Sequence, residues 1–488
     1  MPHAARLTAL SSPSTDRWPL ASTVSDPRRG PLPAGSPAGV LRRTLDALGE
    51  PRVPAAGVGE SAALALVRTL LGEGGIDLRH PYAAAHLQPP VLRVAVEADA
   101  LASAGNASMD TYDSGPATLA IERWVVRSLA GLAGFGAAAD GVLTPGGSMS
   151  NLLAVLIARD VAAARAGVDA RRRGVHGLTR PVVFCSELAH FSVQRACAAL
   201  GLGEDAVVTI GTDQAFRMRP DLLEAELRRP GRTPVAVVAT AGTTDYGSID
   251  PLGEIAELAR AYGTWLHVDA AYGFGALFSD RLAPLLDGLA LADSVTLDLH
   301  KIGWQPAATS VLLVADRNRF AALDRSVDYL NPPDDVDAGL DGLLGRSLQT
   351  TRRPDAVKVA TTLRAYGRTG LGRMLDHCHE LARAAAGRIV ADGNLELLAP
   401  VTLTTVVFRF DADDGVQGEI RRRLLTSGRA LIGRTTMPAR AGRPATTALK
   451  LTLLNPNATP ADIDALLDLV VETGRAVLAD DLNGEGAA

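Results

Sequence analysis

Short apolar segments that recur along the middle of the chain constrain its fold more than any other feature. They are rich in Val, Leu and Ala and read "PVVFCS" (181–186), "VAVVAT" (235–240), "WLHVDAA" (265–271), "SVTLDL" (294–299) and "SVLLVAD" (310–316). Segments with helical patterning, such as "LGEIAELARAYG", separate several of them. Because the apolar segments lack polar alternation, they predict strands covered on both faces. Their alternation with helices predicts an α/β layer structure around a mostly parallel sheet.

The texture of the sequence divides the chain into unequal parts. Residues 1–40 are rich in Pro, Ser, Gly and Arg, which predicts a mobile arm or one ordered only by a partner. Residues 41–135 are patterned as helices with breaks, and residues 136–370 carry the strand-like segments of a large domain. Residues 371–488 combine helices with strand-like "LTTVVFRF" and "ALKLTLL", which predicts a smaller α+β domain.

Composition excludes several classes of function. The 488 residues are 47% hydrophobic and 21% charged, with a formal net charge of -5, which is typical of a globular protein and gives no basic surface for nucleic acid or an anionic membrane. The three cysteines are too few and too scattered for a disulfide framework or a zinc site, so we expect no metal. We find no membrane-length apolar run and no secretion signal, and we therefore expect a cytoplasmic protein.

Polar residues follow several of the expected strands. "TPGGSMSN" (144–151) is a glycine turn that leads into a helix, His190 follows "PVVFCS", Thr243 and Thr244 follow "VAVVAT", and Asp269 ends an apolar run. Taken singly, each has an ordinary explanation: a tight turn with a serine cap, a surface histidine, a polar loop and a structural salt bridge. In an open α/β sheet, however, the carboxyl ends of the strands border the ligand crevice.

A lysine completes this set. "DSVTLDLHKIGWQP" (293–306) ends a strand with Asp298, His300 and Lys301, a costly place for charge unless the charge is used. One cofactor needs such a combination, pyridoxal 5′-phosphate. Its aldehyde needs a lysine for a Schiff base, its ring nitrogen needs a carboxylate, its phosphate needs a helix N-terminus, and its ring needs a flat partner.

The chain resembles the group II pyridoxal-phosphate-dependent amino acid decarboxylases of the fold-type I, aspartate aminotransferase-like superfamily. The resemblance covers about residues 78–460 and is carried, in order, by "HPYAAAHLQPP", "SMDTYDSGPATLAIE", "TPGGSMSN", "SELAHFSV", "TAGTTDYGSIDP", "WLHVDAAYG", "DSVTLDLHK" and "RSLQTTRRPDAVK". It implies a large domain with a mostly parallel central sheet, a small C-terminal α+β domain, and a homodimer with its active site at the interface.

The resemblance also implies roles for residues at matching positions. Lys301 would hold the cofactor covalently, Asp269 would pair with the ring nitrogen, and His190 and Ala271 would cover the two ring faces. Phosphate binding would fall to Gly147, Ser148 and Met149, with help from Thr243 and His300. Tyr82, His86 and Trp304 are candidates to contact the small-molecule substrate, an amino acid, although ordinary packing would also explain each of them.

Two departures from the family pattern bear on the reaction. Many members carry a tyrosine on a loop after the lysine, which returns a proton to Cα. Here residues 331–353 contain no tyrosine, and Tyr329 lies just before them. Another group, such as His190 or Lys301, would then supply the proton, or the carbanion would react with oxygen to give an aldehyde. The second departure is "HKIGWQP", which with "LKLTLLNP" (449–456) resembles the branch that acts on diamino acids such as 2,4-diaminobutyrate, lysine or ornithine.

Other functions remain open at this point. An aromatic or other neutral amino acid could be the substrate, a transaminase could share the fold, and a catalytically inert dimeric relative could keep it. The presence of Lys301, Asp269 and His190 together argues against the inert relative.

Overall fold

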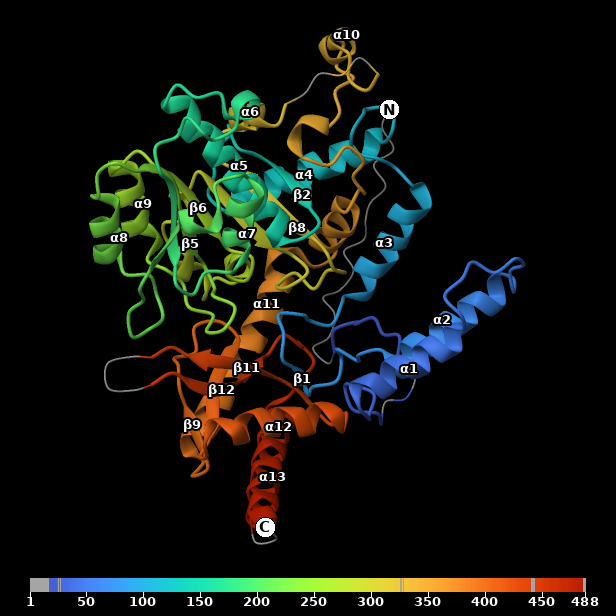
Figure 1. Ribbon diagram of the computed structural model, residues 1–488. Coiled ribbons are helices and arrows are strands. Elements are labelled where there is room, and N and C mark those ends of the chain that lie inside the picture. The colour runs from blue at the N-terminus through green and yellow to red at the C-terminus, as the bar shows by residue number, and fades with distance from the viewer. Residues whose placement is uncertain are drawn as a thin grey trace.

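The computed structural model describes residues 17–24, 26, 28–324, 327, 329–439 and 444–485. A large sheet with helices on both faces lies above a smaller sheet-and-helix unit, and a pair of helices near the N-terminus projects from the side (Figure 1). The α-helices are α1 (Pro37–Leu48), α2 (Glu60–Gly74), α3 (Arg93–Gly105), α4 (Pro116–Leu132), α5 (Gly147–Arg165), α6 (Ala170–Arg173), α7 (Ser192–Ala199), α8 (Pro220–Leu227), α9 (Leu252–Ala261), α10 (Pro333–Asp337), α11 (Ala356–Ala391), α12 (Asp414–Thr426) and α13 (Pro460–Glu485). The strands are β1 (Ala83–Ala84), β2 (Asp140–Thr144), β3 (Pro181–Ser186), β4 (Val207–Ile210), β5 (Thr233–Thr240), β6 (Trp265–Asp269), β7 (Ser294–Asp298), β8 (Ser310–Val314), β9 (Leu395–Leu397), β10 (Thr405–Phe410), β11 (Leu431–Met437) and β12 (Thr446–Thr452).

The large domain is built on a seven-stranded sheet in the order β2-β8-β7-β6-β5-β3-β4. Only β8 runs antiparallel to its neighbours β2 and β7, so the expected mostly parallel sheet is confirmed. Strand residues alternate between two cores. Along β8, Val311 and Leu313 belong to the core that includes α4 and α9, whereas Leu312 and Val314 face α5 and α7. The strands therefore read as continuous apolar runs because both faces are covered.

Helix α5 crosses the face of this sheet and supplies much of the second core. It begins after Gly146, whose φ of 118° lies in a region that side chains rarely adopt. Among the described residues it is the one helix long and apolar enough to cross a membrane, yet 56% of its most apolar window is buried inside the protein. Its apolar character is thus explained by packing between the sheet and α7.

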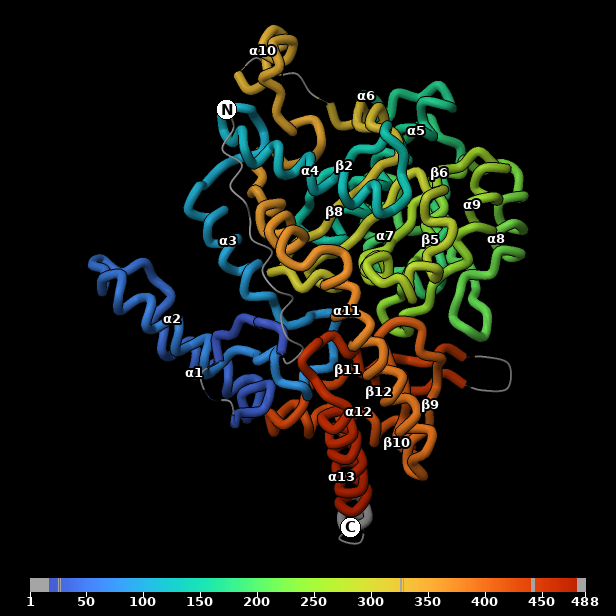
Figure 2. Tube along the Cα trace, turned by 180° about the vertical axis from the view of Figure 1, so that it is seen from behind, coloured from blue at the N-terminus to red at the C-terminus, as the bar shows by residue number. Residues whose placement is uncertain are grey.

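The small domain is built on a five-stranded sheet in the order β1-β11-β12-β10-β9, with α12 and α13 packed against it. Strand β1 comes from the N-terminal region and pairs in parallel with β11. Residues 41–135 are therefore divided among the projecting helices, the small sheet and the large domain. Helix α11 joins the two domains, as the view from behind shows (Figure 2), and it is broken at Gly367, where φ is 59°. The boundary expected at residue 371 falls within this helix.

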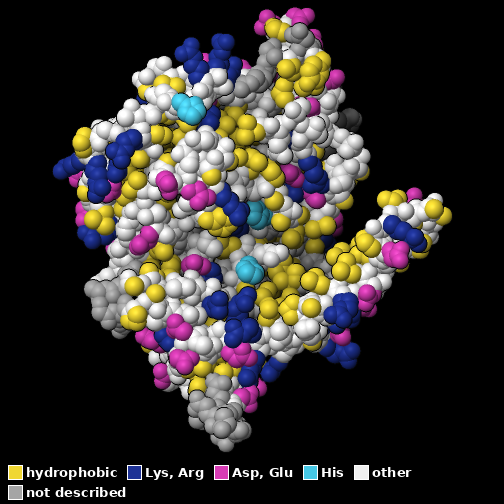
Figure 3. Space-filling view, viewed as in Figure 1, with side chains coloured by type: hydrophobic (Ala, Val, Ile, Leu, Met, Phe, Trp, Pro, Cys, Tyr) yellow, Lys and Arg dark blue, Asp and Glu magenta, His cyan; other side chains and the backbone are white. Residues whose placement is uncertain are grey.

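The projecting arm consists of α1 and α2, which pack against each other. None of the described side chains of either helix is buried, and Leu41 and Leu45 are 66% and 64% exposed. Hydrophobic side chains run along the arm in the space-filling view (Figure 3). Of the mobile arm expected over residues 1–40, residues 1–16, 25 and 27 lie outside the described residues. At Trp18 the chain is tied to the body, because Asn457 accepts from the Trp18 amide and donates to its carbonyl oxygen.

Candidate active site

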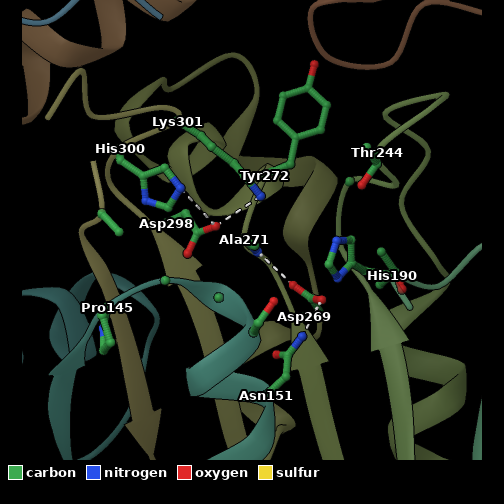
Figure 4. Close-up of a pocket in the computed structure, with 16 residues that line it drawn as sticks. Pro145, Asn151, His190, Thr244, Asp269, Ala271, Tyr272, Asp298, His300 and Lys301 are labelled. Atoms are coloured by element: carbon green, nitrogen blue, oxygen red, sulfur yellow. Dashed lines mark hydrogen bonds and ion pairs between the residues drawn. The ribbon is translucent and has the colours of Figure 1, made fainter. Parts of the chain in front are cut away.

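The carboxyl ends of β5, β6 and β7 and the first turn of α5 border a cavity of about 330 Å³ (Figure 4). This volume lies within the range of about 300–1,000 Å³ found for small-molecule sites. Its lining comprises Pro145, Gly146, Gly147, Ser148, Asn151, His190, Thr240, Gly242, Thr244, Asp269, Ala271, Tyr272, Asp298, His300, Lys301 and Ala308. Most of the residues singled out in the sequence thus meet at one sheet edge, as strand-end residues of a parallel sheet do.

Lys301 and His300 converge on one carboxylate. The Lys301 Nζ atom lies 2.9 Å from Asp298 Oδ2, and His300 Nε2 lies 3.6 Å from the same oxygen. His300 Nδ1 lies 2.9 Å from the Thr309 carbonyl oxygen, which fixes the ring. Asp298 Oδ1 is buried and has no hydrogen-bond partner among the described residues. This side of the cavity therefore offers an amine together with an unused acceptor.

Asp269 lies across the cavity floor with its charge stabilised by two donors. The Ala271 amide donates to Oδ1 at 3.1 Å, and Asn151 Nδ2 donates to Oδ2 at 2.8 Å. The residue is 6% exposed, and these two donors satisfy one acceptor site on each of its oxygens. Its position at the end of β6 presents a fixed negative charge to any ring placed above Ala271.

His190 stands beside Asp269 at the opposite wall from Lys301 (Figure 4). Its Nδ1 atom is 2.8 Å from Ser192 Oγ, and its ring lies 4.2 Å, centroid to centroid, from that of Phe191. Burial lowers the pKa of His190 below its usual 6.5, and this effect outweighs the nearby Asp269 charge. The imidazole is therefore neutral at neutral pH.

The first turn of α5 forms a cradle with free backbone N–H groups. Gly147 is its essential element, since an added Cβ would lie 3.1 Å from both carboxylate oxygens of Asp298 and 3.4 Å from the Ala271 Cβ. Ser148 lines the cavity, but Met149 does not, because its side chain packs on the core beneath α5. The Met149 amide donates to the Gly146 carbonyl oxygen at 3.0 Å and so is engaged within the turn.

The structure corrects the expectation for Thr243. Its hydroxyl lies 2.7 Å from that of Ser248 in a buried pair, and Thr244 lines the cavity in its place. The strand pattern does not predict which of the two threonine side chains faces the cavity. The loop that begins at Gly242, where φ is 96°, decides which hydroxyl points inward.

None of the expected substrate residues lines this cavity. Trp304 is fully buried in the large core, and its indole donates to the Leu454 carbonyl oxygen at 2.9 Å, so it links the two domains instead. The Tyr82 carbonyl oxygen accepts from the Leu431 amide next to β1, and the ring packs edge-on to His80. His86 is exposed on the following loop.

Sequence reasoning missed several lining residues, chiefly Asn151, Thr240 and Tyr272. Asn151 lies in the quoted motif "TPGGSMSN", so its position one turn into α5 was the available signal. Tyr272 follows the "HVDAA" strand end. Its hydroxyl bonds to the hydroxyls of Thr404 and Thr405 in the small domain, at 2.8 and 3.0 Å, and burial raises the pKa of the phenol.

This donor set fits pyridoxal phosphate. Lys301 supplies the amine, Asp269 the carboxylate, His190 and Ala271 two flat surfaces, and the α5 turn the N–H groups for a phosphate. No group of three or more His, Cys, Asp or Glu side chains in the described part of the chain could hold a metal ion.

Comparison with known proteins agrees with this chemistry. A family profile described as "Pyridoxal-dependent decarboxylase conserved domain" matches residues 67–411. An L-2,4-diaminobutyrate decarboxylase of Rhizobium meliloti (strain 1021) is 43% identical over 444 residues, which are 89% of this chain and 86% of that protein. One from Acinetobacter baumannii is 35% identical over 434 residues, with 85% and 84% covered.

Solved structures place the fold in the same group. The crystal structure of the glutamate decarboxylase domain of a diaminobutyrate-pyruvate transaminase and L-2,4-diaminobutyrate decarboxylase from Vibrio parahaemolyticus matches with a TM-score of 0.81 and 31% identity, over 92% of both chains. Mouse CSAD matches with a TM-score of 0.83 and 28% identity, over 93% of this chain and 95% of that one. The chain therefore belongs to the pyridoxal-dependent decarboxylase family, whose cofactor is pyridoxal phosphate.

Proposed function

We propose that this enzyme removes the α-carboxylate of a diamino acid, with L-2,4-diaminobutyrate as the first candidate and lysine or ornithine as alternatives. One observation carries the choice of substrate: two relatives named for 2,4-diaminobutyrate, at 43% and 35% identity, align with 89% and 85% of this chain. The balanced reaction breaks the Cα–carboxylate bond, releases CO₂ and adds one proton at Cα, so that 2,4-diaminobutyrate gives 1,3-diaminopropane.

Pyridoxal phosphate, when bound, supplies the sink for the electron pair left at Cα. Lys301 would hold the cofactor through its aldehyde and give way to the substrate's amino group. Asp269 would pair with the ring nitrogen, and its two donors hold the carboxylate in place for that contact. His190 and Ala271 would fix the ring plane from opposite faces.

The phosphate would lie at the first turn of α5, against Gly147 and Ser148, with Thr244 replacing Thr243 as the hydroxyl from the neighbouring loop. The N-terminal dipole of this 19-residue helix favours an anion there. His300 would contribute to the site chiefly by contacting Asp298, in addition to any contact with the phosphate.

Proton return to Cα falls to Lys301 in this scheme. The amine that gives way to the substrate remains in the cavity, where Asp298 2.9 Å away orients it. The neutral His190 is the less suitable donor, because its lowered pKa leaves one ring N–H but no spare proton at neutral pH. Tyr329 is 83% exposed and does not line the cavity.

A second outcome, oxidation of the carbanion to an aldehyde, is favoured by one observation. Residues 331–353 lack the tyrosine that returns the proton in many relatives. If Lys301 is slow, O₂ would take the two electrons left at Cα and become hydrogen peroxide, and water would hydrolyse the resulting imine to the aldehyde and ammonia.

We further propose a cytoplasmic homodimer with the site at its interface. The exposed Leu41 and Leu45 of the projecting arm support this, since contiguous exposed apolar surface marks an interaction face.

A product assay tests the reaction. The protein loaded with pyridoxal phosphate is offered 2,4-diaminobutyrate, ornithine, lysine, glutamate and aromatic amino acids, and products are identified by mass while oxygen uptake is followed. We expect 1,3-diaminopropane without oxygen uptake, and an Asp269→Ala variant should lose most of the turnover. An amine from another amino acid alone would overturn the substrate assignment. An aldehyde with oxygen uptake would replace simple decarboxylation by its oxidative form.

A further inference from the structure

Asn151 connects the two groups that flank the cofactor site. One N–H of its amide donates to Asp269 Oδ2 at 2.8 Å, and the other donates to Ser192 Oγ at 2.9 Å. Ser192 Oγ in turn lies 2.8 Å from His190 Nδ1. Asn151 is 1% exposed and lies directly below Asp269 (Figure 4). A single buried amide therefore contacts the carboxylate directly and the imidazole through one hydroxyl.

The direction of the bonds behind Asn151 is fixed from both ends. Asp269, as a carboxylate, can only accept, so the amide nitrogen of Asn151 faces it and the amide oxygen faces away. That oxygen lies 3.0 Å from His267 Nε2, which must therefore carry a hydrogen. At the far end the indole of Trp265 can only donate, and it donates to Ser294 Oγ at 2.9 Å.

Ser294 closes the gap between these ends. Its hydroxyl accepts from Trp265 and lies 2.8 Å from His267 Nδ1, which has no hydrogen when the ring is neutral. Burial lowers the pKa of His267 to about 4, so the neutral ring is the form present at neutral pH. The donors thus point in one direction, from Trp265 through Ser294, His267 and Asn151 to Asp269.

The branch through Ser192 follows the same logic. Ser192 Oγ accepts from Asn151 and has one hydrogen left, for which His190 Nδ1 is the acceptor. The Ser192 backbone amide also donates to His190 Nδ1, at 3.3 Å. Both contacts make Nδ1 an acceptor. The ring hydrogen of the neutral imidazole therefore lies on Nε2, the atom not engaged in these bonds.

We propose that Asn151 is the positioning residue of this site: it orients the Asp269 carboxylate and, through Ser192, sets His190 in the tautomer with hydrogen on Nε2. This rests on the proposed roles of Asp269 and His190. Water does not compete for these hydrogen bonds, because Ser192, His267 and Ser294 are 2%, 1% and 0% exposed. Asn151 acts without contacting substrate, through the two groups that would contact the cofactor.

Asn151→Asp provides the sharpest test, because it changes one amide nitrogen to oxygen at constant volume. The new carboxyl group cannot donate to Asp269 unless it is protonated, and it cannot donate to Ser192, whose hydroxyl is then free to donate to it. Nitrogen-15 NMR of histidine-labelled, cofactor-free protein reports which ring nitrogen of each histidine carries hydrogen. We expect Nε2–H for both His190 and His267 in the wild type, and a second population with Nδ1–H for His190 in the variant.

Ser192→Ala removes only the branch to His190, and Ser150→Ala is the matched control. Ser192→Ala should change the His190 signal and leave that of His267 in place. Ser150 is the neighbour of Asn151 in α5, is fully buried and bonds to Thr144 and Ser310, so its loss costs similar packing but should leave both histidine signals unchanged. Resonances are assigned with His190→Gln and His267→Gln.

Turnover supplies the second readout. Asn151→Asp should lower kcat by roughly 10- to 100-fold with KM little changed, the range seen when a residue that orients a functional ligand is replaced. Hydrogen on Nδ1 of His190 in the wild type, an unchanged His190 signal in Asn151→Asp, or unchanged kcat there, would each overturn the proposal. The NMR measurement uses no substrate, so a wrong substrate assignment would fail in the product assay and leave the tautomer result standing.

Discussion

Lys301 Nζ lies 2.9 Å from Asp298 Oδ2, and the second oxygen of that carboxylate is buried without a donor among the described residues. Asp298 is the last residue of β7 and Lys301 follows it by three residues, so the strand end holds amine and acid at a fixed separation. The carboxylate therefore aims the amine into the cavity before any cofactor arrives. The covalent capture of pyridoxal phosphate should depend on this contact.

Removing the acid should slow that capture. In Asp298→Ala the Lys301 amine loses its orienting partner, and the visible absorbance of covalently bound cofactor should grow roughly 10- to 100-fold more slowly after mixing, the cost of misplacing a reacting group. Stopped-flow absorbance measures the rate. Asp293→Ala removes a carboxylate just before the same strand, where, within the described part of the chain, it accepts from the Leu266 amide, and this change should leave the rate unchanged. Equal rates in wild type and Asp298→Ala would contradict the role.

Replacing the lysine separates charge from chemistry. Lys301→Arg keeps a cation beside Asp298 but offers no primary amine, and Lys301→Ala removes both. Neither variant should develop the absorbance band of covalently bound cofactor or turn over substrate. Spectra recorded after loading and gel filtration check this. A band that persists in either variant would mean that another residue holds the cofactor.

The first turn of α5 should not tolerate a methyl group at position 147. In Gly147→Ala the new Cβ would lie 3.1 Å from both Asp298 oxygens and would occupy the phosphate cradle. Such overpacking costs about 1–3 kcal/mol, so the Kd for pyridoxal phosphate should rise about tenfold. Fluorescence titration measures it. Gly253→Ala is the control, since Gly253 also lies in a first helical turn but has open space at its Cβ position. Similar Kd values for the two variants would contradict the prediction.

Stability should fall as the pH is lowered through the range set by His267. Burial lowers its pKa in the folded protein from 6.5 to about 4, so between these values the unfolded chain binds a proton that the folded protein does not. The contribution of the neutral His267 ring to the free energy of unfolding is fully present above pH 6.5. About 3 kcal/mol of that free energy is lost by pH 4. Burial raises the pKa of Asp250 to about 6, which changes stability with pH in the opposite direction. A variant of His267 is therefore needed to isolate the contribution of that ring.

Urea unfolding at pH 7.5 and pH 5 makes that comparison. His267→Gln should be less stable than the wild type at pH 7.5, and it should lose less stability on acidification. His176→Gln, at an exposed position, should follow the wild type at both pH values. An unchanged pH dependence in His267→Gln would show that the buried ring does not titrate as stated.

The projecting arm should control self-association. Leu41→Ser combined with Leu45→Ser removes two exposed leucines of α1, each worth about 1.5–3 kcal/mol when buried. The dissociation constant of the dimer, measured by sedimentation velocity, should rise more than tenfold. Activity should fall in parallel when the protein is diluted. Arg42→Ser with Asp46→Ser changes exposed polar residues of the same helix and should have little effect. A double leucine variant that sediments like the wild type would exclude the arm from the interface.

The layer structure and the site's outline were accessible from local patterns. The strand-end positions of Asp269 and Lys301 follow from where apolar runs stop, because burial on both faces makes each strand a continuous apolar segment. Parallel strands then bring these ends to one edge whatever their separation along the chain. The family motifs added which cofactor such an edge would hold.

Side-chain direction was not accessible in the same way. Thr243 and Thr244 are adjacent, yet a glycine with positive φ turns one into a buried bond with Ser248 and the other into the cavity. Trp304 follows the lysine closely, but it points into the core and bonds to Leu454 in the small domain. The conformation of the loop at Gly242 decided the first case, and a neighbour 150 residues away decided the second.

What the sequence by itself determined is the kind of fold, the class of cofactor and the residues that reach the sheet edge, since these depend on hydrophobic periodicity and on residue types at strand ends. Only the tertiary structure decided that β1 joins the small sheet and that Trp265, Ser294, His267 and Asn151 form one directed series behind Asp269. Hydrogen bonds need donor and acceptor within about 3 Å. That distance is set by the packing of α5 on β6 and β7, which local sequence does not encode.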